Sequence, residues 1–200
     1  MTFEEPEGAT PLNPDERQGL KYDHVTTRLE LDELEQANIE QGLTWVSRRR
    51  RGSIFDDEFI RLLHRQLFGD VWQWAGEYRK TEKNLGVEPH RISTEVRILL
   101  DDARFWKERG VYLPLEAAAR FHHRMVQIHP FPNGNGRHAR IATDIFLEEA
   151  LEHPPIAWAS GVDLQADNLR RKAYIRALRA ADGGELEPLL RFVGAHADPR

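Results

Sequence analysis

The sequence predicts an all-α protein, because apolar residues recur at helical spacing along most of the chain and strand-like alternation is confined to one short stretch. Cap residues, glycines and prolines divide the periodic stretches into about six to eight helices. The chain has 200 residues, and 40% of them are hydrophobic. This length and composition suit one domain with an extension, built around a packed core.

The composition excludes several classes of protein. The chain has no cysteine, which rules out a disulfide scaffold, a thiolate metal site and a cysteine nucleophile. The net charge is −5, from 28 basic and 33 acidic residues, so nothing favours non-specific binding of nucleic acid. No stretch approaches the roughly 18 apolar residues of a membrane span, and the acidic N-terminus lacks the apolar segment of a signal peptide. We therefore expect a cytoplasmic protein with no membrane partner and no direct nucleic-acid partner.

The N-terminal part of the chain divides into two regions. Residues 1–25 are rich in proline, glycine and acidic side chains, which predicts a leader that is either flexible or laid over the surface. Residues 26–54 are expected to form an N-terminal helical extension. Residues 55–195 would then form the main domain.

The extension contains one long helical pattern over residues 27–46, with Thr26 or Thr27 as the N-cap. Its apolar face is formed by Leu31, Leu34, Ile39, Leu43 and Val46. Four arginines at 48–51 precede Gly52, which is typical of a helix C-terminus. Contact with a phosphate or a partner is the alternative role for these arginines.

The main domain opens with a second helix. Ser53 to Asp56 resembles a capping box, with aspartate in the place of glutamate. The residues behind it with core spacing are Phe59, Leu62, Leu63, Leu67 and Phe68. Trp72 and Trp74 follow, and we expect both to lie in the core.

Residues 76–92 break the helical pattern. Two short extended pieces on either side of residues 84–86 predict a β-hairpin, whose weakly apolar flanks would not be stable alone. Later helices are expected over residues 93–110, 114–128, 141–151, 164–181 and 186–193. Asp163 is the expected N-cap of the helix that begins at Leu164.

The stretch from His129 to Arg140 carries the chemistry. Pro130 ends a helix at His129, and residues 132–136 form a tight loop in which glycine and asparagine allow positive φ and close approach of a ligand. Arg137 and Arg140 lie three residues apart on the first turn of the next helix, so we expect them to project from one side. A helix N-terminus with two arginines binds anions, and a polyphosphate would engage all of these groups.

His129 lies at the near end of this loop. An imidazole has an ordinary pKa of about 6.5, which suits a general base near neutral pH. A base beside a bound polyphosphate suggests transfer of a phosphate-bearing group to a hydroxyl.

The stretch closely resembles the signature of the Fic/Doc family, His-x-Phe-x-acidic-Gly-Asn-Gly-Arg-x-x-Arg. The matching residues are His129, Phe131, Gly134, Asn135, Gly136, Arg137 and Arg140. Residues 76–79 resemble the family's entry into its flap hairpin, and residues 172–178 resemble its late helix. Residues 8–12 and 35–39 are similar to the subgroup called mobile mystery protein B.

The resemblance implies a helical bundle with a short β-hairpin flap beside the active-site loop. It implies a nucleotidyltransferase that moves AMP from ATP to a Ser, Thr or Tyr hydroxyl of a target protein. His129 would be the base, Asn135, Arg137 and the loop amides, Gly134 and Gly136 among them, would hold the α- and β-phosphates, and Arg140 would reach the γ-phosphate. The flap residues expected to hold the target by strand addition are Lys83, Asn84, Leu85, Gly86 and Val87. The alternatives are transfer of another phosphate-bearing group, or a nucleotide-binding regulatory module without catalysis.

One departure from the signature concerns metal binding. Asn133 occupies the family's acidic position, which helps to bind Mg²⁺. An amide oxygen neutralises no charge, so we expect Mg²⁺ to bind weakly and to depend on the phosphates of ATP.

A second departure concerns regulation. Many family members carry an inhibitory helix with the pattern Ser/Thr-x-x-x-Glu-Gly/Asn, and the approximate match here is Thr26 to Glu30, followed by Leu31. The other interpretation is an N-cap with an exposed helical acid. A separately encoded inhibitor, or the helix-turn-helix partner that accompanies the mobile mystery subgroup, is therefore expected as a partner, which would suit a toxin–antitoxin pair.

The remaining polar residues are assigned structural roles. The nine histidines lack metal-binding spacing, and His122 and His123 are adjacent and so face different directions on a helix. Asp144 follows Arg140 by one helical turn, which predicts a surface ion pair, with support of the orientation of Arg140 as the alternative.

Overall fold

Helices make up nearly all the regular structure of the chain. The computed structural model describes residues 12–50, 52–158, 164 and 168–194. The α-helices are α1 (Pro14–Gln18), α2 (Arg28–Arg48), α3 (Asp57–Phe68), α4 (Ile92–Arg109), α5 (Pro114–Ile128), α6 (Asn135–Ile145), α7 (Leu169–Asp182) and α8 (Glu187–Val193). A 3₁₀ turn, η1 (Pro89–Arg91), precedes α4, and a π-helical turn, η2 (Phe146–Ala150), extends α6. The predicted all-α class is confirmed.

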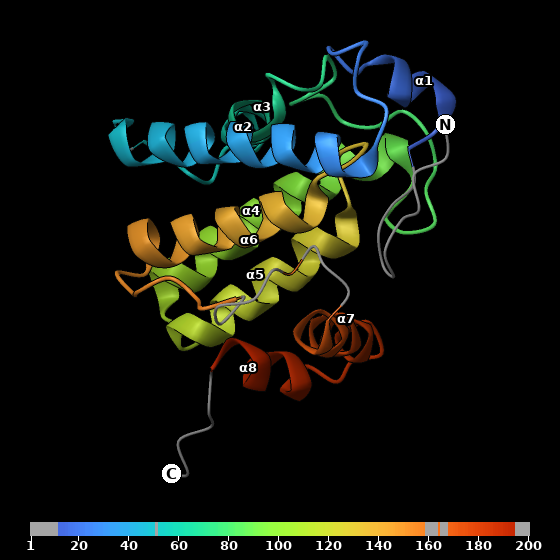
Figure 1. The fold of residues 1–200 in the computed structure, drawn as a ribbon. Coiled ribbons are helices and arrows are strands. Elements are labelled where there is room, and N and C mark those ends of the chain that lie inside the picture. Colours follow the sequence, from blue (N-terminus) through green and yellow to red (C-terminus); the bar gives the residue numbers. More distant parts are fainter. Residues whose placement is uncertain (1–11, 51, 159–163, 165–167, 195–200) are drawn as a thin grey trace.

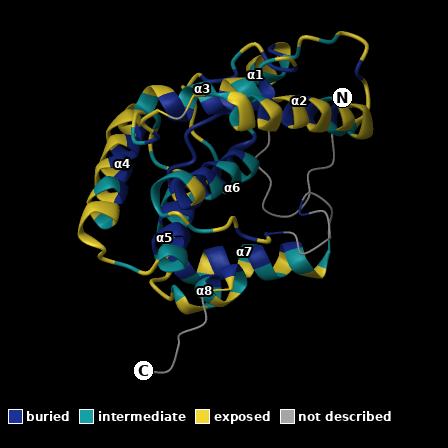
Figure 2. Cartoon of the chain, turned by 90° about the vertical axis from the view of Figure 1, so that its left-hand side faces the viewer, coloured by how far each residue is buried: buried dark blue, intermediate teal, exposed yellow. Residues whose placement is uncertain are grey.

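Helix α5 lies at the centre of the arrangement. It packs against α4 and α6 on the side of the larger cluster of buried side chains, and against α7 and α8 on the side of the smaller one. In Figure 1, α2 runs along one end of the bundle, and α7 and α8 lie at the other. Figure 2 shows the buried residues gathered on α5 and α6, while α4 turns an exposed face outward. The loop between α5 and α6 therefore lies on a rigid, buried pair of helices.

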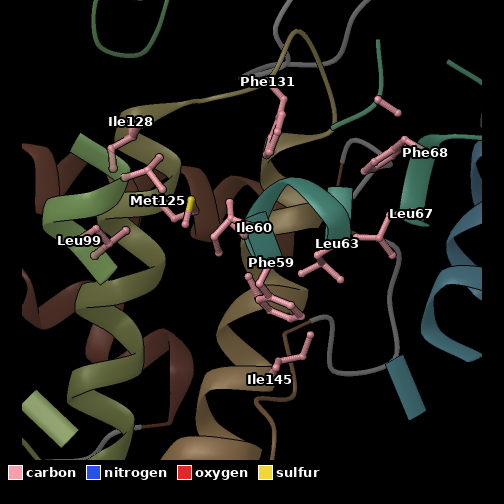
Figure 3. Close-up of a cluster of buried hydrophobic side chains, with 14 of the residues drawn as sticks. Phe59, Ile60, Leu63, Leu67, Phe68, Leu99, Met125, Ile128, Phe131 and Ile145 are labelled. Atoms are coloured by element: carbon pink, nitrogen blue, oxygen red, sulfur yellow. The ribbon is translucent and has the colours of Figure 1, made fainter. Parts of the chain in front are cut away.

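The larger core is built largely from the buried faces of α3, α4 and α5. Its fully buried members include Ile60, Leu63, Leu67, Phe68, Leu99, Met125, Ile128 and Phe131. Figure 3 shows Phe131 descending from the loop after α5 toward the side chains of α3. Of the predicted core residues of α3, Phe59, Leu63, Leu67 and Phe68 are buried. Leu62 is only half-buried and is not part of this core.

Most helix boundaries follow the predicted signals. Thr27 caps α2 in a capping box with Glu30, Pro114 opens α5, and Gly110 ends α4 in the left-handed conformation. Two predictions are wrong. Asp56 is the N-cap of α3 but makes no side-chain capping bond, and the late helix begins at Leu169 rather than Leu164.

The cap of α7 is Asn168, whose side chain accepts from the Arg171 amide at 2.9 Å. Asp163, the predicted cap, lies outside the described residues.

The predicted β-hairpin is absent: residues 76–92, all of which the structure describes, contain no strand. The side chain of Arg79 takes the place of cross-strand pairing. Its guanidinium donates to the carbonyls of Thr81 and Val87 and so closes the segment into a loop around itself. The sequence predicted a hairpin from two weakly apolar flanks, and such flanks pair only weakly. The hydrogen bonds of the buried Arg79 side chain hold the segment together in their place.

Residues 12–25 of the leader are laid over the surface. Leu12 and Val25 are buried, and an antiparallel bridge joins Leu20 to Trp72. The described part of the leader therefore follows the second of the two predicted alternatives. In the part of the chain that the structure describes, no helix combines the length and the hydropathy needed to cross a bilayer.

Candidate active site

The loop between α5 and α6 is shaped by Gly134. This residue has a φ of 76° and is the N-cap of α6, and a Cβ added there would meet the ring of Phe68 at 2.7 Å. Both the left-handed backbone and the aromatic neighbour therefore require glycine. The first hydrogen bond of α6 runs from the His138 amide to the Gly134 carbonyl at 2.9 Å. The amides of residues 135–137 consequently point out of the end of the helix, where an anion would bind.

Asn135 holds the loop together. Its side-chain nitrogen donates to the Phe131 carbonyl at 2.7 Å, and its side-chain oxygen accepts from the Phe131 amide at 2.8 Å. Asn135 is buried, so its side chain gives the loop its shape. Its backbone amide is the part placed to meet a phosphate.

His129 begins the loop and is almost fully enclosed. It follows the last residue of α5 with a φ of 53°, and 5% of its surface is exposed. Burial, together with the nearby positive charges of Arg79 and Lys83, lowers the pKa of the imidazole to about 4, although a backbone hydrogen bond partly offsets the effect. The expected ordinary pKa of about 6.5 is thus corrected. The imidazole is neutral at physiological pH, which is the state that accepts a proton.

The segment from Lys83 to Val87 lies over His129. A Cβ added at Gly86 would meet the Cβ of His129 at 2.8 Å, and the Val87 amide donates to the Ile128 carbonyl at 3.2 Å. Arg79 fixes the other end of the contact by donating to the His129 carbonyl at 2.7 Å. The predicted flap residues are therefore next to the predicted base, although they form a loop instead of a hairpin.

The leader holds this segment from the other side. Glu16 of α1 forms an ion pair with Lys83 and accepts from the Thr81 hydroxyl at 3.0 Å. Asn84, Leu85 and Gly86 remain exposed. These three residues, rather than Lys83, are available to a target segment.

Arg137 reaches toward α2 and α3. Its guanidinium donates to the carboxylate of Glu35 at 2.6 Å and lies 4.8 Å from the centre of the Phe68 ring. Glu35 is buried, and its other oxygen accepts from the indole of Trp72 at 2.7 Å. Glu35 stood out in the sequence only through the subgroup resemblance, and no sequence pattern indicated this contact. Glu30, the acid of the approximate inhibitory match, instead completes the capping box of α2.

Arg140 contacts a different helix. Its guanidinium carbon lies 5.7 Å from the centre of the Tyr174 ring on α7, and one of its nitrogens comes close to Gly136. The two arginines begin on the same side of α6, as predicted, but their guanidinium groups diverge toward Glu35 and Tyr174. The N-terminus of α6 lies between these two contacts.

Asn133 does not provide a metal site by itself. Its side-chain oxygen accepts from the Gly134 amide at 2.5 Å, so the oxygen that was expected to reach Mg²⁺ is turned into its own loop. Among the described residues, no group of three His, Cys, Asp or Glu side chains could hold a metal ion. The protein residues present here therefore do not fit a resident Mg²⁺ ion.

His64 supports the loop from below and was not identified from the sequence. Its Nε2 is 3.1 Å from the Asn133 carbonyl, and its Nδ1 accepts from the Gly76 amide at 3.0 Å. The acceptor role of Nδ1 places the proton on Nε2, which then donates to Asn133. The ring also stacks on Phe131 with 3.8 Å between centroids. The only sequence feature that could have identified His64 is its position on the apolar face of the predicted helix.

Asp144 lies inward and bonds to the segment after η2. Its carboxylate accepts from the Ile156 amide and from the Trp158 indole, each at 3.0 Å. Burial raises its pKa to about 6, and Arg140 is close enough to lower it. The predicted surface ion pair is therefore wrong, because Asp144 holds residues 156–158 against α6.

The fold and the site define a helical domain with a glycine-containing loop between two packed helices and a neutral histidine beside it. Residues 54–147 match the family model described as Fic/DOC family. Over these residues the chain is similar to members of the Fic/Doc family. Its resemblance to the mobile mystery protein B subgroup stays a prediction.

Relatives of known name point to the same family. The chain is 28% identical over 146 residues to "Protein adenylyltransferase Fic" of Aedes aegypti, covering 68% of this chain and 28% of that protein. It is 29% identical over 171 residues to the protein of the same name from Nematostella vectensis, covering 82% of this chain and 38% of that one. The chain thus spans well under half the length of these two relatives.

Solved structures share the fold. The Fic domain of a cell filamentation protein from Bartonella quintana superposes with a TM-score of 0.70 at 18% identity, covering 89% of this chain and 90% of that one. The BepC protein of Bartonella tribocorum, solved with bound AMPPNP, gives a TM-score of 0.69 at 19% identity and covers 90% and 96%.

Proposed function

We propose that this protein is a protein adenylyltransferase that moves AMP from ATP to a Ser, Thr or Tyr hydroxyl of a target protein. The observation that carries the proposal is the position of neutral, buried His129 directly before a helix N-terminus that bears Arg137 and Arg140. The names of the matched relatives support the same reaction. ATP as the substrate also suits a cytoplasmic location.

In the proposed reaction, the target hydroxyl attacks the α-phosphorus of ATP. A bond forms between the hydroxyl oxygen and the α-phosphorus, the bond from the α-phosphorus to the bridging oxygen breaks, and pyrophosphate leaves. His129 accepts the hydroxyl proton. The amides of residues 135–137 and the guanidinium of Arg137 stabilise the α- and β-phosphates, and Arg140 binds the γ-phosphate. Mg²⁺ brought in with ATP would offset phosphate charge.

The target segment is proposed to bind along residues 84–86. Beside them lies a groove of about 420 Å³. It is lined by the loop, α4, α5 and α7 through residues that include Leu85, Val87, Glu95, Arg124, Val126 and Leu178. The exposed backbone of residues 84–86 can pair with an extended peptide, while the groove would hold one of its side chains. A separately encoded inhibitor or a helix-turn-helix partner stays a prediction.

Labelled ATP distinguishes the proposed reaction from its alternatives. Label from α-labelled ATP retained on protein supports transfer of AMP. Label from γ-labelled ATP alone would mean phosphorylation. ATP binding without transfer of either label would mean a regulatory module.

The role of His129 has its own test. His129→Ala is expected to abolish transfer while ATP affinity, measured by calorimetry, stays within about twofold, because the imidazole acts on the hydroxyl. His90→Ala is the matched control, since His90 is exposed. Equal activity of the His129 variant and wild type would refute its role as the base.

A further inference from the structure

A buried chain of contacts connects α5 to Arg140 through α7. His122 on α5 is fully buried, and its Nε2 lies 2.9 Å from the hydroxyl of Tyr174 on α7. Tyr174 is 4% exposed, and the centre of its ring lies 5.7 Å from the guanidinium carbon of Arg140. Neither His122 nor Tyr174 has a role in the reaction described above. Tyr174 nevertheless contacts Arg140, which is part of the proposed phosphate site, and His122 contacts Tyr174.

The direction of the hydrogen bond between His122 and Tyr174 follows from the groups around His122. The Thr143 hydroxyl donates its hydrogen to the Ala139 carbonyl at 2.7 Å. His122 Nδ1 lies 3.5 Å from the Thr143 oxygen, whose only hydrogen is already donated to Ala139. The Thr143 oxygen can therefore only accept from His122, so Nδ1 carries the proton. A neutral imidazole protonated at Nδ1 has an acceptor at Nε2. The Tyr174 hydroxyl therefore donates to His122.

This direction leaves the lone pairs of the Tyr174 oxygen for the Arg140 guanidinium. A tyrosine hydroxyl has one hydrogen, and His122 takes it. The oxygen therefore keeps its lone pairs, and its partial negative charge, for the nearby guanidinium of Arg140. An arginine side chain loses conformational freedom when it is immobilised, so an arginine that is already held binds a phosphate more tightly.

We propose that Tyr174, oriented by His122, is a positioning residue for Arg140 and thereby sets the affinity of the site for the terminal phosphate of a nucleoside triphosphate. The inference rests on the proposed function, in which Arg140 binds the γ-phosphate. Tyr174 lies on α7, beyond the matched residues 54–147. The second cluster of buried side chains, which joins α7 to α5, thus has a functional consequence.

The contacts of His122 explain why the arrangement is rigid. Its ring packs against Trp158, with 4.4 Å between ring centroids. The indole of Trp158 is in turn held by Asp144 at 3.0 Å. His122 is therefore fixed by neighbours on α6 and on residues 156–158, as well as by Tyr174, and cannot turn its acceptor nitrogen away.

The test compares ATP with AMP in variants of the full chain. Tyr174→Phe keeps the ring and removes only the hydroxyl. We expect calorimetry to show about a fivefold loss of ATP affinity and no change in AMP affinity, because AMP has no terminal phosphate for Arg140. In the transfer assay, KM for ATP should rise by the same factor while kcat stays within about twofold. Tyr112→Phe, on the far side of α5, should change neither quantity.

A double-mutant cycle separates positioning from a merely structural role. In an Arg140→Ala background, Tyr174→Phe should have no further effect on ATP affinity, because the group through which it acts is gone. Additive losses in the double variant, or equal losses for ATP and AMP in Tyr174→Phe, would overturn the inference. Wild-type protein that binds no ATP would instead remove the proposed function, and the inference with it.

Variants of His122 provide a second route if Tyr174→Phe does not fold. His122→Gln retains an oxygen that can accept from Tyr174, whereas His122→Leu does not. We expect ATP affinity to be largely preserved in the Gln variant and to fall about fivefold in the Leu variant, with AMP affinity unchanged in both. The same loss in both variants would contradict the proposed chain of contacts.

Discussion

The guanidinium of Arg137 donates to the carboxylate of Glu35 at 2.6 Å and so joins the first arginine of the signature to a residue 102 positions earlier in the chain. This ion pair is almost wholly shielded from water, since 3% of the Glu35 side chain and 12% of the Arg137 side chain are exposed. The positive charge of Arg137 is therefore already balanced by Glu35 when a phosphate reaches the end of α6. The contact therefore links α2 to the strength of nucleotide binding.

Replacing this acid should strengthen nucleotide binding. Glu35→Gln removes the negative charge beside Arg137 but keeps an oxygen that can accept from Trp72. We expect ATP affinity, measured by calorimetry, to rise about fivefold, because one like charge near the phosphates is lost. Glu40→Gln, on the exposed face of α2, is the matched control and should leave the affinity unchanged. An unchanged or lower ATP affinity in Glu35→Gln would show that the ion pair instead orients Arg137 for its ligand.

Gly134 and Gly110 form a matched pair for testing the loop. Both have positive φ, 76° and 59°, but a Cβ at Gly134 would meet Phe68, whereas a Cβ at Gly110 would meet nothing within 4 Å. We expect Gly110→Ala to cost about 1 to 2 kcal/mol of unfolding free energy from backbone strain alone. Gly134→Ala should cost more and should also weaken ATP binding at least tenfold. Urea unfolding and calorimetry measure the two effects. Equal behaviour of the two variants would mean that Phe68 yields without moving the loop.

His64 is predicted to stabilise the loop through its two hydrogen bonds. His64→Leu leaves the Asn133 carbonyl and the Gly76 amide without this buried partner, which should cost about 2 kcal/mol or more. ATP affinity should fall as well, because Asn133 lies directly before the helix N-terminus. His90→Leu, at an exposed position, is the control. Urea unfolding that gives the same free energy for both variants would contradict the role of His64.

Stability should fall as the solution is made acidic below neutral pH. Burial lowers the pKa of His129 and His138 to about 4 and that of His122 to about 3, from an ordinary value of 6.5, and it lowers the pKa of His64 well below its usual range. The unfolded chain therefore binds protons that the folded protein does not as pH drops from about 6.5 toward 4. Each such histidine removes up to about 1.4 kcal/mol of stability per pH unit in that window.

One carboxyl group acts in the opposite direction. The pKa of Asp144 is raised to about 6 from 3.8, so the folded protein binds this proton first and gains stability as pH falls through the same range. Because four histidines oppose one aspartate, the net effect is a loss. Urea unfolding at pH 7, 6 and 5 checks this, with His64→Gln expected to show a shallower slope. Stability that is constant or higher at pH 5 would exclude neutral buried histidines in the folded protein.

The parts that could be predicted from the sequence were those with local causes. Thr27 with Glu30 makes a capping box within one turn, and Pro114 and Gly110 mark helix ends through their own backbone preferences. The loop before α6 belongs to the same class, since Gly134 needs its positive φ whatever surrounds it. The predicted hairpin was wrong because contacts between residues far apart in the sequence determine the path of this segment. Arg79 folds residues 79–87 around itself, and no local pattern shows that its partner carbonyls include that of His129.

The amino-acid sequence alone determined the helical class, most helix ends, and the order of groups from His129 to Arg140, because each depends on residues within a few positions of one another. Only the tertiary structure decided what these groups contact. It buries His129 beneath residues 83–87, which lowers its pKa, and it sends Arg137 to Glu35 and Arg140 to Tyr174. These contacts depend on how α2 and α7 pack around α6, and packing is a property of the whole chain that no short pattern encodes.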